Sequence, residues 1–161
     1  MPVVKITNSQ LIQAKQVLER LSAKTQIPTG LRWAAVQAKK TVEPLIKDLG
    51  DHELALVREF AEIGPDGQIV QPTAPDGSKV PNGWVFRGFS STQDLDASDL
   101  EGRKAAEAAF KDTVDTWRER QESLMGAENE INVAPRPLAE FEATDLSGDD
   151  LLNIWFLVKD E

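Results

Sequence analysis

The chain has 161 residues, with 27 Asp and Glu against 18 Lys and Arg and a formal net charge of −9. It has no cysteine and one histidine, which excludes disulfide frameworks, thiolate nucleophiles and most metal sites built from cysteines or paired imidazoles. The acidic excess argues against a sequence-independent grip on nucleic-acid phosphates. The hydrophobic content of 40% is near the globular average, and the length predicts one domain, residues 1–161.

No stretch of the sequence has the length of a membrane span. The longest apolar run, residues 151–158, is interrupted by Asn153, whereas a span needs about 20 apolar residues. The first residues lack the apolar region of a secretory signal. We therefore expect no membrane partner, and a place in the interior of a cell or in an exported particle.

The first part of the chain predicts a short strand followed by helices. Residues 3–6 are β-prone, and a helix is expected from Asn8 or Ser9 to about residue 23, because apolar residues recur there at steps of three to four. A second helical stretch runs over residues 31–63 with Pro44 inside it, so the helix kinks there or a new helix begins there. Helices joined by a short loop should lie antiparallel.

The segment over residues 64–83 differs because it repeats one turn signal. Residues 64–67 read Gly-Pro-Asp-Gly and residues 74–77 read Ala-Pro-Asp-Gly. Pro supplies φ near −65° and Gly accepts positive φ, so both sets are typical of turns. We predict a β-hairpin or irregular arm, inserted over residues 64–90 and projecting from a helical body.

The last part of the chain predicts a long helix, a strand and a short helix. Ser98 and Glu101 have the spacing of a capping box, so a helix should run from there to about residue 125. Residues 131–133 alternate like a strand, and Ser147 should cap a last helix ending near residue 158. The predicted fold class is α+β, mostly α, with antiparallel helices, a projecting β-hairpin arm and short terminal strands that pair with each other.

Candidate catalytic and metal sites each have a simpler structural reading. His52 suits proton transfer, but no nucleophile-elbow sequence accompanies it, so we expect an exposed helical histidine. The acidic run over residues 94–99 lacks the Gly and Glu that a calcium loop requires. Asp145, Asp149 and Asp150 fit the first turn of a helix, where carboxylates interact favourably with the helix dipole. We predict no catalytic residue, no metal and no cofactor.

One segment of the predicted arm has the composition of a protein-interface hot spot. It combines three aromatic residues with an arginine, namely Trp84, Phe86, Arg87 and Phe89. The alternative is that the aromatic side chains pack the arm onto the helices. Stacking on single-stranded bases is a third reading, which the negative charge opposes.

The second candidate contact segment is the apolar run near the C-terminus. A helix over residues 151–158 would be apolar nearly all round and would need cover on several sides. It forms the central core helix, or it docks into another subunit, where a groove would receive Ile154, Trp155 and Val158. This segment is the main reason to expect oligomerisation or assembly.

The order of these features is familiar. A β-prone start leads into a helix over residues 11–21, a lysine-rich helix over residues 34–45, a Pro-Asp-Gly break, a long acidic helix, residues 130–133 with Pro137 and Leu138, and a leucine-rich end. This pattern resembles a loose group of small, uncharacterised proteins encoded by tailed bacteriophages and prophages. The resemblance implies a phage-encoded protein and no particular reaction, and the arm is longer than expected for the group.

Two hypotheses about function follow, with an enzyme or a small-molecule sequestering protein as a third. The first is a non-enzymatic phage protein that contacts itself or other phage structural proteins, as a tail, connector or capsid-associated component or an assembly component. The second is an acidic antagonist of a host defence or nucleic-acid-binding protein, whose carboxylates mimic nucleic acid or cap a basic site. These place the protein in the virion or the host cytoplasm.

The charge is distributed unevenly along the chain. Residues 1–47 contain eight Lys and Arg against two acidic residues, a net charge of +6, so the remainder carries −15. A chain polarised in this way is suited to meet a neighbouring copy head to tail, basic end to acidic end. The sequence therefore predicts self-assembly as well as acidity.

Overall fold

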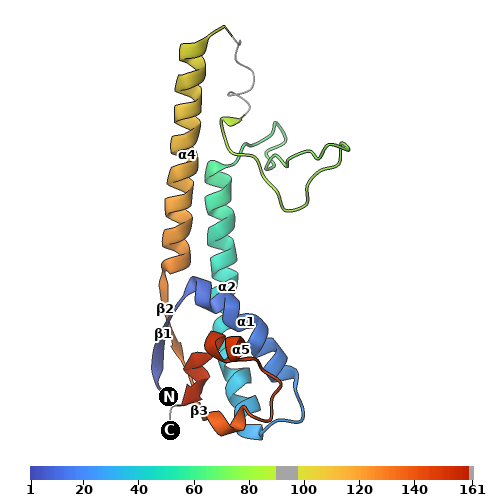
Figure 1. Ribbon diagram of the computed structural model, residues 1–161, viewed down its shortest axis with the longest axis vertical. Coiled ribbons are helices and arrows are strands. Elements are labelled where there is room, and N and C mark those ends of the chain that lie inside the picture. Colours follow the sequence, from blue (N-terminus) through green and yellow to red (C-terminus); the bar gives the residue numbers. More distant parts are fainter. Residues whose placement is uncertain (90–97, 160–161) are drawn as a thin grey trace. The chain divides into compact units, whose positions relative to one another are not determined.

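The computed structural model describes residues 1–89 and 98–159 (Figure 1). The chain falls into two compact units: unit 1 comprises Met1–Gly50 and Leu124–Glu161, and unit 2 comprises Asp51–Ser123. Two long helices cross the boundary, α2 (Thr29–Phe60) and α4 (Leu100–Gly126). The single domain therefore stays a prediction. The fold class, α+β and mostly α, is confirmed.

Unit 1 begins with a strand and a capped helix. Helix α1 (Asn8–Ala23) is capped by Thr7, one or two residues earlier than predicted. The Thr7 hydroxyl accepts a hydrogen bond from the Gln10 N–H (3.2 Å), and the Gln10 side chain accepts one from the Thr7 N–H (2.9 Å). This reciprocal capping box fixes where strand β1 (Val3–Thr7) turns into helix.

The predicted pairing of the short strands is confirmed. β1 pairs antiparallel with β2 (Glu128–Asn132), with Val4 opposite Ile131. A second, two-residue pair joins β3 (Arg136–Pro137) in parallel with β4 (Val158–Lys159). The beginning and the end of the chain are thereby held together in unit 1.

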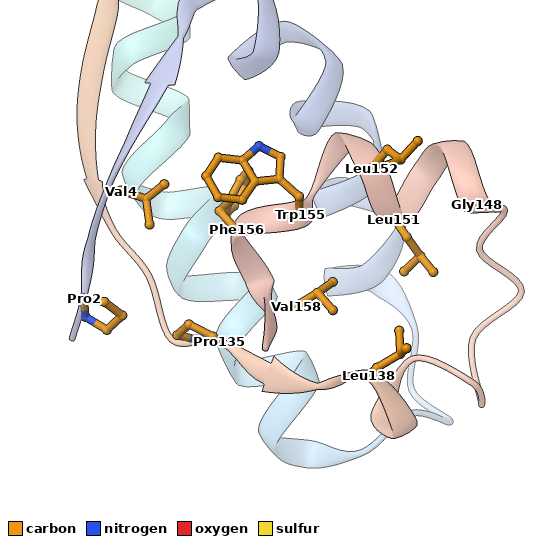
Figure 2. Close-up of a pocket in the computed structure, with 10 residues that line it drawn as sticks. All are labelled: Pro2, Val4, Pro135, Leu138, Gly148, Leu151, Leu152, Trp155, Phe156 and Val158. Atoms are coloured by element: carbon orange, nitrogen blue, oxygen red, sulfur yellow. The ribbon is translucent and has the colours of Figure 1, made fainter. Parts of the chain in front are cut away.

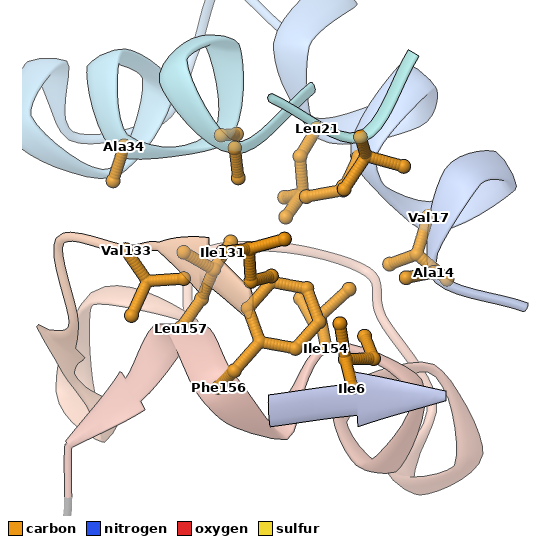
Figure 3. Close-up of a cluster of buried hydrophobic side chains, with 14 of the residues drawn as sticks. Ile6, Ala14, Val17, Leu21, Ala34, Ile131, Val133, Ile154, Phe156 and Leu157 are labelled. Carbon is orange, nitrogen blue, oxygen red and sulfur yellow. The ribbon is translucent and has the colours of Figure 1, made fainter. Parts of the chain in front are cut away.

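The core of unit 1 is mainly aliphatic and includes two buried phenylalanines, Phe141 and Phe156. Figure 3 shows side chains from α1, the first part of α2, β1, β2 and the C-terminal segment meeting in one cluster. The largest fully buried side chains are Ile6, Leu11, Leu18, Leu21, Leu31, Ile131, Ile154 and Leu157. The stripe predicted for α1 is buried as expected, since Leu11, Ala14 and Leu18 face this cluster.

One continuous helix spans Pro44, where the sequence left two alternatives open. Helix α2 runs through Pro44, so the alternative of a new helix beginning there is wrong. Helix α2 ends at Phe60 rather than near Ile63. The reason is that Ala61 and Ile63 leave the helix to form isolated β-bridges with Phe86 and Ile69.

The C-terminal helix is shorter than predicted. Helix α5 (Gly148–Asn153) ends where Ile154 takes φ −121°, and a 3₁₀ turn η2 (Trp155–Leu157) follows before β4. A single helix over residues 148–158 is therefore wrong. The change of conformation lets Ile154, Phe156 and Leu157 all face the core, which one helical stripe would not allow.

Unit 2 contains an antiparallel helix pair whose members are joined by the arm rather than by a short loop. The part of α2 from Asp51 onwards and α4 run side by side in opposite directions (Figure 1). Arg120 joins them, because it forms an ion pair with Glu59 and lies 5.5 Å from the centre of the Phe60 ring. Helix α4 is capped by Asp99 rather than by Ser98, since the Asp99 carboxylate accepts the Gly102 N–H (2.8 Å).

The arm of unit 2 is irregular rather than a regular β-hairpin. In its first turn the Gly67 N–H donates to the Gly64 carbonyl (2.9 Å) and the Gln68 N–H to the Asp66 carboxylate (3.0 Å). The same bonds recur over residues 74–78, and both fourth-position glycines have positive φ. Over residues 61–87 the pairing consists of isolated bridges only, so the irregular alternative holds.

One further short element belongs to unit 1. It is the 3₁₀ turn η1 (Leu138–Glu140), which precedes α5 in the chain.

Candidate protein-interaction site

An apolar pocket of about 450 Å³ opens on unit 1 beside the C-terminal segment (Figure 2). Two of the predicted contact residues, Trp155 and Val158, line it. Its lining residues come from β1, η1, α5, η2, β4 and the residues that precede β1 and β3: Pro2, Val4, Pro135, Leu138, Gly148, Leu151, Leu152, Trp155, Phe156 and Val158. No lining residue carries a charged or hydrogen-bonding side chain apart from the Trp155 indole.

Large apolar side chains around this pocket are exposed to solvent. Leu152 is 70% exposed, Leu138 48% and Trp155 45%. Trp155 is exposed because the turn at Ile154 directs it away from the core between two buried residues. Neighbouring exposed apolar side chains of this size are typical of protein contact surfaces. We call the ten lining residues the pocket face.

The structure corrects the expectation for Ile154. Its side chain has no exposed surface and lies in the core beside Leu157. A partner's groove therefore does not receive Ile154 while unit 1 is folded, and for this residue the core alternative holds. Val158 is half-buried, so of the three predicted residues Trp155 offers the most surface.

Sequence reasoning missed several residues of the pocket face. Leu138 and Leu152 are among its most exposed members, and Pro2 and Val4 bring the first strand to it. The sequence contained a signal for Val4. Val4 and the buried Ile6 are two residues apart, so they lie on the same face of the strand. No sequence signal brings Leu138 to this site, since it depends on the pairing of β3 with β4.

The acidic cluster next to the pocket is a helix start held by ion pairs. Asp150 closes a capping box with Ser147 and forms an ion pair with Arg20, and Asp145 forms one with Lys24. The Ser147 N–H, followed by Arg20, holds the pKa of the Asp150 carboxyl below its ordinary value. The reading as a helix start, rather than as a magnesium site, agrees with these partners.

These ion pairs also bear on the predicted head-to-tail assembly. Arg20 and Lys24 from the basic first segment meet acidic residues of the last segment, and Lys5 lies 3.6 Å from Glu128. Some of the basic residues that could meet the acidic residues of another copy are therefore already paired with acidic residues of their own chain. The assembly of basic end to acidic end stays a prediction with fewer free charges to support it.

Two of the predicted arm residues pack against α4. The ring centres of Trp84 and Phe86 lie 5.5 Å and 5.4 Å from that of Trp117, and Phe86 lies 6.1 Å from Phe110. Trp84 and Phe86 are half-buried. Their main role in the structure is therefore to hold the arm to the helix, which was the alternative reading.

The other two predicted arm residues are exposed. Phe89 is 39% exposed, and its ring lies 5.7 Å from Phe110. Arg87 is exposed, and its backbone N–H donates to the Phe60 carbonyl (2.8 Å). Arg87 and part of Phe89 thus remain accessible to a partner, and the structure places both in unit 2.

Unit 2 has a second pocket, of about 600 Å³, between α2 and the arm. Trp84 lines it together with Leu54, Val57 and Ile69, but charged and amide side chains, among them Arg58, also line it. This pocket is therefore more polar than the pocket face of unit 1. The indole N–H of Trp117, whose ring contacts that of Trp84, is buried and has no hydrogen-bond partner among the described residues.

The remaining chemical candidates give no site in the described residues. His52 is exposed on α2, as expected. Within residues 1–89 and 98–159 no group of three His, Cys, Asp or Glu side chains is arranged to hold a metal ion. The rejected calcium loop lies largely outside these residues. No helix in the same ranges is long and apolar enough to span a membrane.

The structure thus offers one candidate site, the pocket face of unit 1, with the exposed arm residues as a second surface. Comparisons of the chain with models of protein families, with curated proteins and with solved structures found no match.

Proposed function

We propose that the protein is a non-enzymatic, phage-encoded protein that acts through protein–protein contacts, as a virion component of tail, connector or capsid type or as an assembly component. One observation carries the contact part of this proposal, namely the exposed apolar side chains of the pocket face. The phage context comes from the order of sequence features described above.

The chemistry of the pocket favours a protein partner over a small molecule. A small-molecule site usually places a few polar groups among its apolar walls to orient the ligand. Here the lining side chains offer one indole N–H and otherwise carbon, so the backbone supplies the remaining polar groups of the walls. Such a surface suits apolar side chains of another protein, and burial of one exposed Leu or Trp contributes on the order of 1.5–3 kcal/mol.

Incorporation into particles tests this function. We expect mass analysis of purified particles to detect the chain, and Trp155→Ala to lower its amount. Trp33→Ala is a matched control, because Trp33 is 52% exposed in unit 1 and does not line the pocket. Absence of the wild-type chain from particles and from assembly intermediates would contradict the proposal, and equal loss for both variants would remove the role of the pocket face.

A second candidate is the acidic antagonist of a basic host protein. Unit 2 supports it, because it contains fifteen Asp and Glu against eight Lys and Arg. We expect such a complex to weaken steeply as salt is raised, since surface charges are screened. Binding that is indifferent to ionic strength would count against this candidate.

A further inference from the structure

The edge of β1 has backbone groups that its own unit does not use. The Val133 N–H donates to the Pro2 carbonyl (3.0 Å), which shows that β1 bonds to β2 through every second residue from Pro2. Because bonding alternates along an antiparallel pair, the N–H and C=O groups of Val3 and Lys5 point away from β2. Both residues are exposed, and no backbone bond from another described segment reaches them.

We propose that this edge pairs with the same edge of a second copy of the chain. Two β1 strands would lie antiparallel about a two-fold axis, giving a four-stranded sheet in the order β2–β1–β1–β2. A two-fold interface must be self-complementary. Pairing centred on Val4 meets this condition, because Val3 of each copy then faces Lys5 of the other and all the outward groups of both residues find partners. This interface rests on the proposed function, action through protein contacts.

The apolar surface beside β1 favours the same arrangement. Val4 lies on the face of β1 that lines the pocket (Figure 2). Pairing centred on Val4 puts the two Val4 side chains opposite each other at a non-hydrogen-bonded position, where facing side chains approach most closely. Trp155 and Leu152 belong to the same pocket face, so the interface extends from strand edge to exposed apolar surface.

The opposite edge of the sheet is unsuited to self-pairing. The outward positions of β2 are those opposite Thr7, Lys5 and Val3, and two of them are Glu128 and Glu130. Antiparallel pairing centred on Asn129 or Glu130 would set glutamates opposite each other, and like charges in that position are destabilising. β1 is therefore the edge that accepts a second copy.

The charge of the units points to the same copy-to-copy contact. Unit 1 contains twelve Asp and Glu against ten Lys and Arg, whereas unit 2 contains fifteen against eight. Two copies of unit 1 therefore meet with little net repulsion, although the whole chain carries −9. A nearly neutral surface with exposed apolar side chains fits a second copy of itself.

Single cysteines test the pairing directly, because the chain has no cysteine of its own. Cα atoms at a non-hydrogen-bonded antiparallel position lie about 4.5 Å apart, within the range that a disulfide spans. We expect Val4→Cys to form a covalent dimer on mild oxidation and Glu130→Cys, on the other edge, to stay monomeric. A monomeric Val4→Cys, or equal cross-linking of the two variants, would overturn the proposal.

A proline pair tests the role of the backbone groups. Lys5 and Glu130 lie directly opposite each other, and of the backbone donors each proline substitution removes only an outward N–H, which an edge strand tolerates. In sedimentation over a dilution series we expect a dimer for the wild type and for Glu130→Pro, and a monomer for Lys5→Pro. A wild type that is monomeric throughout, or a folded Lys5→Pro that still dimerises, would overturn the pairing. If circular dichroism shows that Lys5→Pro is unfolded, the cysteine result decides.

The pairing and the proposed function fail in different ways. Incorporation into particles by a chain whose Val4→Cys variant stays monomeric would overturn the pairing and leave the contact function standing. A covalent Val4→Cys dimer from a chain that enters no particle or complex would support the pairing and contradict the function.

Discussion

The two units of the chain are held together by different kinds of contact. Unit 1 has a mainly aliphatic core of buried side chains drawn from both ends of the sequence. Among the described residues of unit 2 the buried apolar side chains are Leu56, Phe60 and Ala61, and the unit relies on half-buried aromatic rings between the arm and α4. Helix α4 has no fully buried residue at all among its 27.

This difference bears on two properties of each unit, its resistance to local opening and the apolar surface that it exposes. Buried aliphatic side chains contribute most to the free energy of unfolding, so unit 1 should resist local opening. Half-buried rings and isolated bridges hold unit 2, and regions of this kind open at lower cost. The most exposed apolar surface nevertheless lies on unit 1, where a rigid core fixes its shape for a partner.

The largest expected effect comes from a cavity in the core of unit 1. Ile154→Ala should lower the free energy of unfolding by about 2–5 kcal/mol, because Ile154 is fully buried. Leu54→Ala, at a 48% exposed site in unit 2, is the control and should cost much less. Chemical denaturation measures both. A stable Ile154→Ala with lost partner binding would show that Ile154 is an interface residue after all.

A second substitution should loosen unit 2 alone. Trp117→Ala removes the ring contacts with Trp84 and Phe86, each worth about 0.5–1.5 kcal/mol. Hydrogen exchange should become faster at the amides of Glu62, Val70 and Arg87, whose hydrogen bonds join the arm to the residues at and just after the end of α2.

The amides of the unit 1 core provide the internal reference for that experiment. Their exchange should be unchanged in Trp117→Ala, since Trp117 belongs to unit 2. A uniform acceleration in both units would mean that they unfold as one, and the contrast drawn between them would be wrong.

Two glycines of α2 give a smaller, opposite pair of effects. Gly50→Ala should raise the free energy of unfolding by about 0.5–1 kcal/mol, because a Cβ there meets nothing within 4 Å and alanine favours helix. At Gly30 a Cβ would lie 2.5 Å from Arg136 Nη2 and would displace the guanidinium from Glu140.

Gly30→Ala should therefore bring no gain in thermal stability, or a loss. The comparison is made by thermal unfolding of both variants against the wild type. Equal stabilisation by the two substitutions would show that the Arg136–Glu140 pair contributes nothing at this contact.

The smallest effect concerns pH. The folded pKa of Asp150 lies below its ordinary value of 3.8, mainly because of the hydrogen bond from Ser147 and then because of Arg20. Its contribution to stability is therefore complete above that ordinary value and is lost as the pH falls through the folded pKa. Asp150→Asn should flatten the acid side of the stability profile, and an unchanged profile would contradict this role.

Local patterns predicted most of the elements, and long-range pairing decided the rest. Periodicity located α1 and α2, and turn chemistry located the two Pro-Asp-Gly turns. The predicted end of α5 lies too late in the chain. An apolar run alone does not show that Ile154, Phe156 and Leu157 must all face one core. Val158 pairs with Arg136 in a short strand instead of continuing the helix, and no local sequence pattern predicts that pairing.

The candidate site was predicted in part for the same reason. Trp155 stands out by composition, so the sequence indicates it directly. In the sequence Ile154 is as apolar as Trp155, so both were candidates for a contact. The turn at Ile154 buries Ile154 and exposes Trp155. Leu138 enters the site through the short β3–β4 pair, which only the three-dimensional structure brings together.

The contact function of unit 1 is tested most directly by a charge placed on each of the two pockets. Leu152→Asp alters the apolar pocket face, and Leu54→Asp alters the more polar pocket of unit 2; both leucines are exposed, so both variants should fold. The quantity to measure is the amount of each variant in purified particles, relative to wild type. We predict strong loss for Leu152→Asp and near-normal incorporation for Leu54→Asp. Normal incorporation of Leu152→Asp beside loss of Leu54→Asp would contradict the assignment of the contact surface to unit 1.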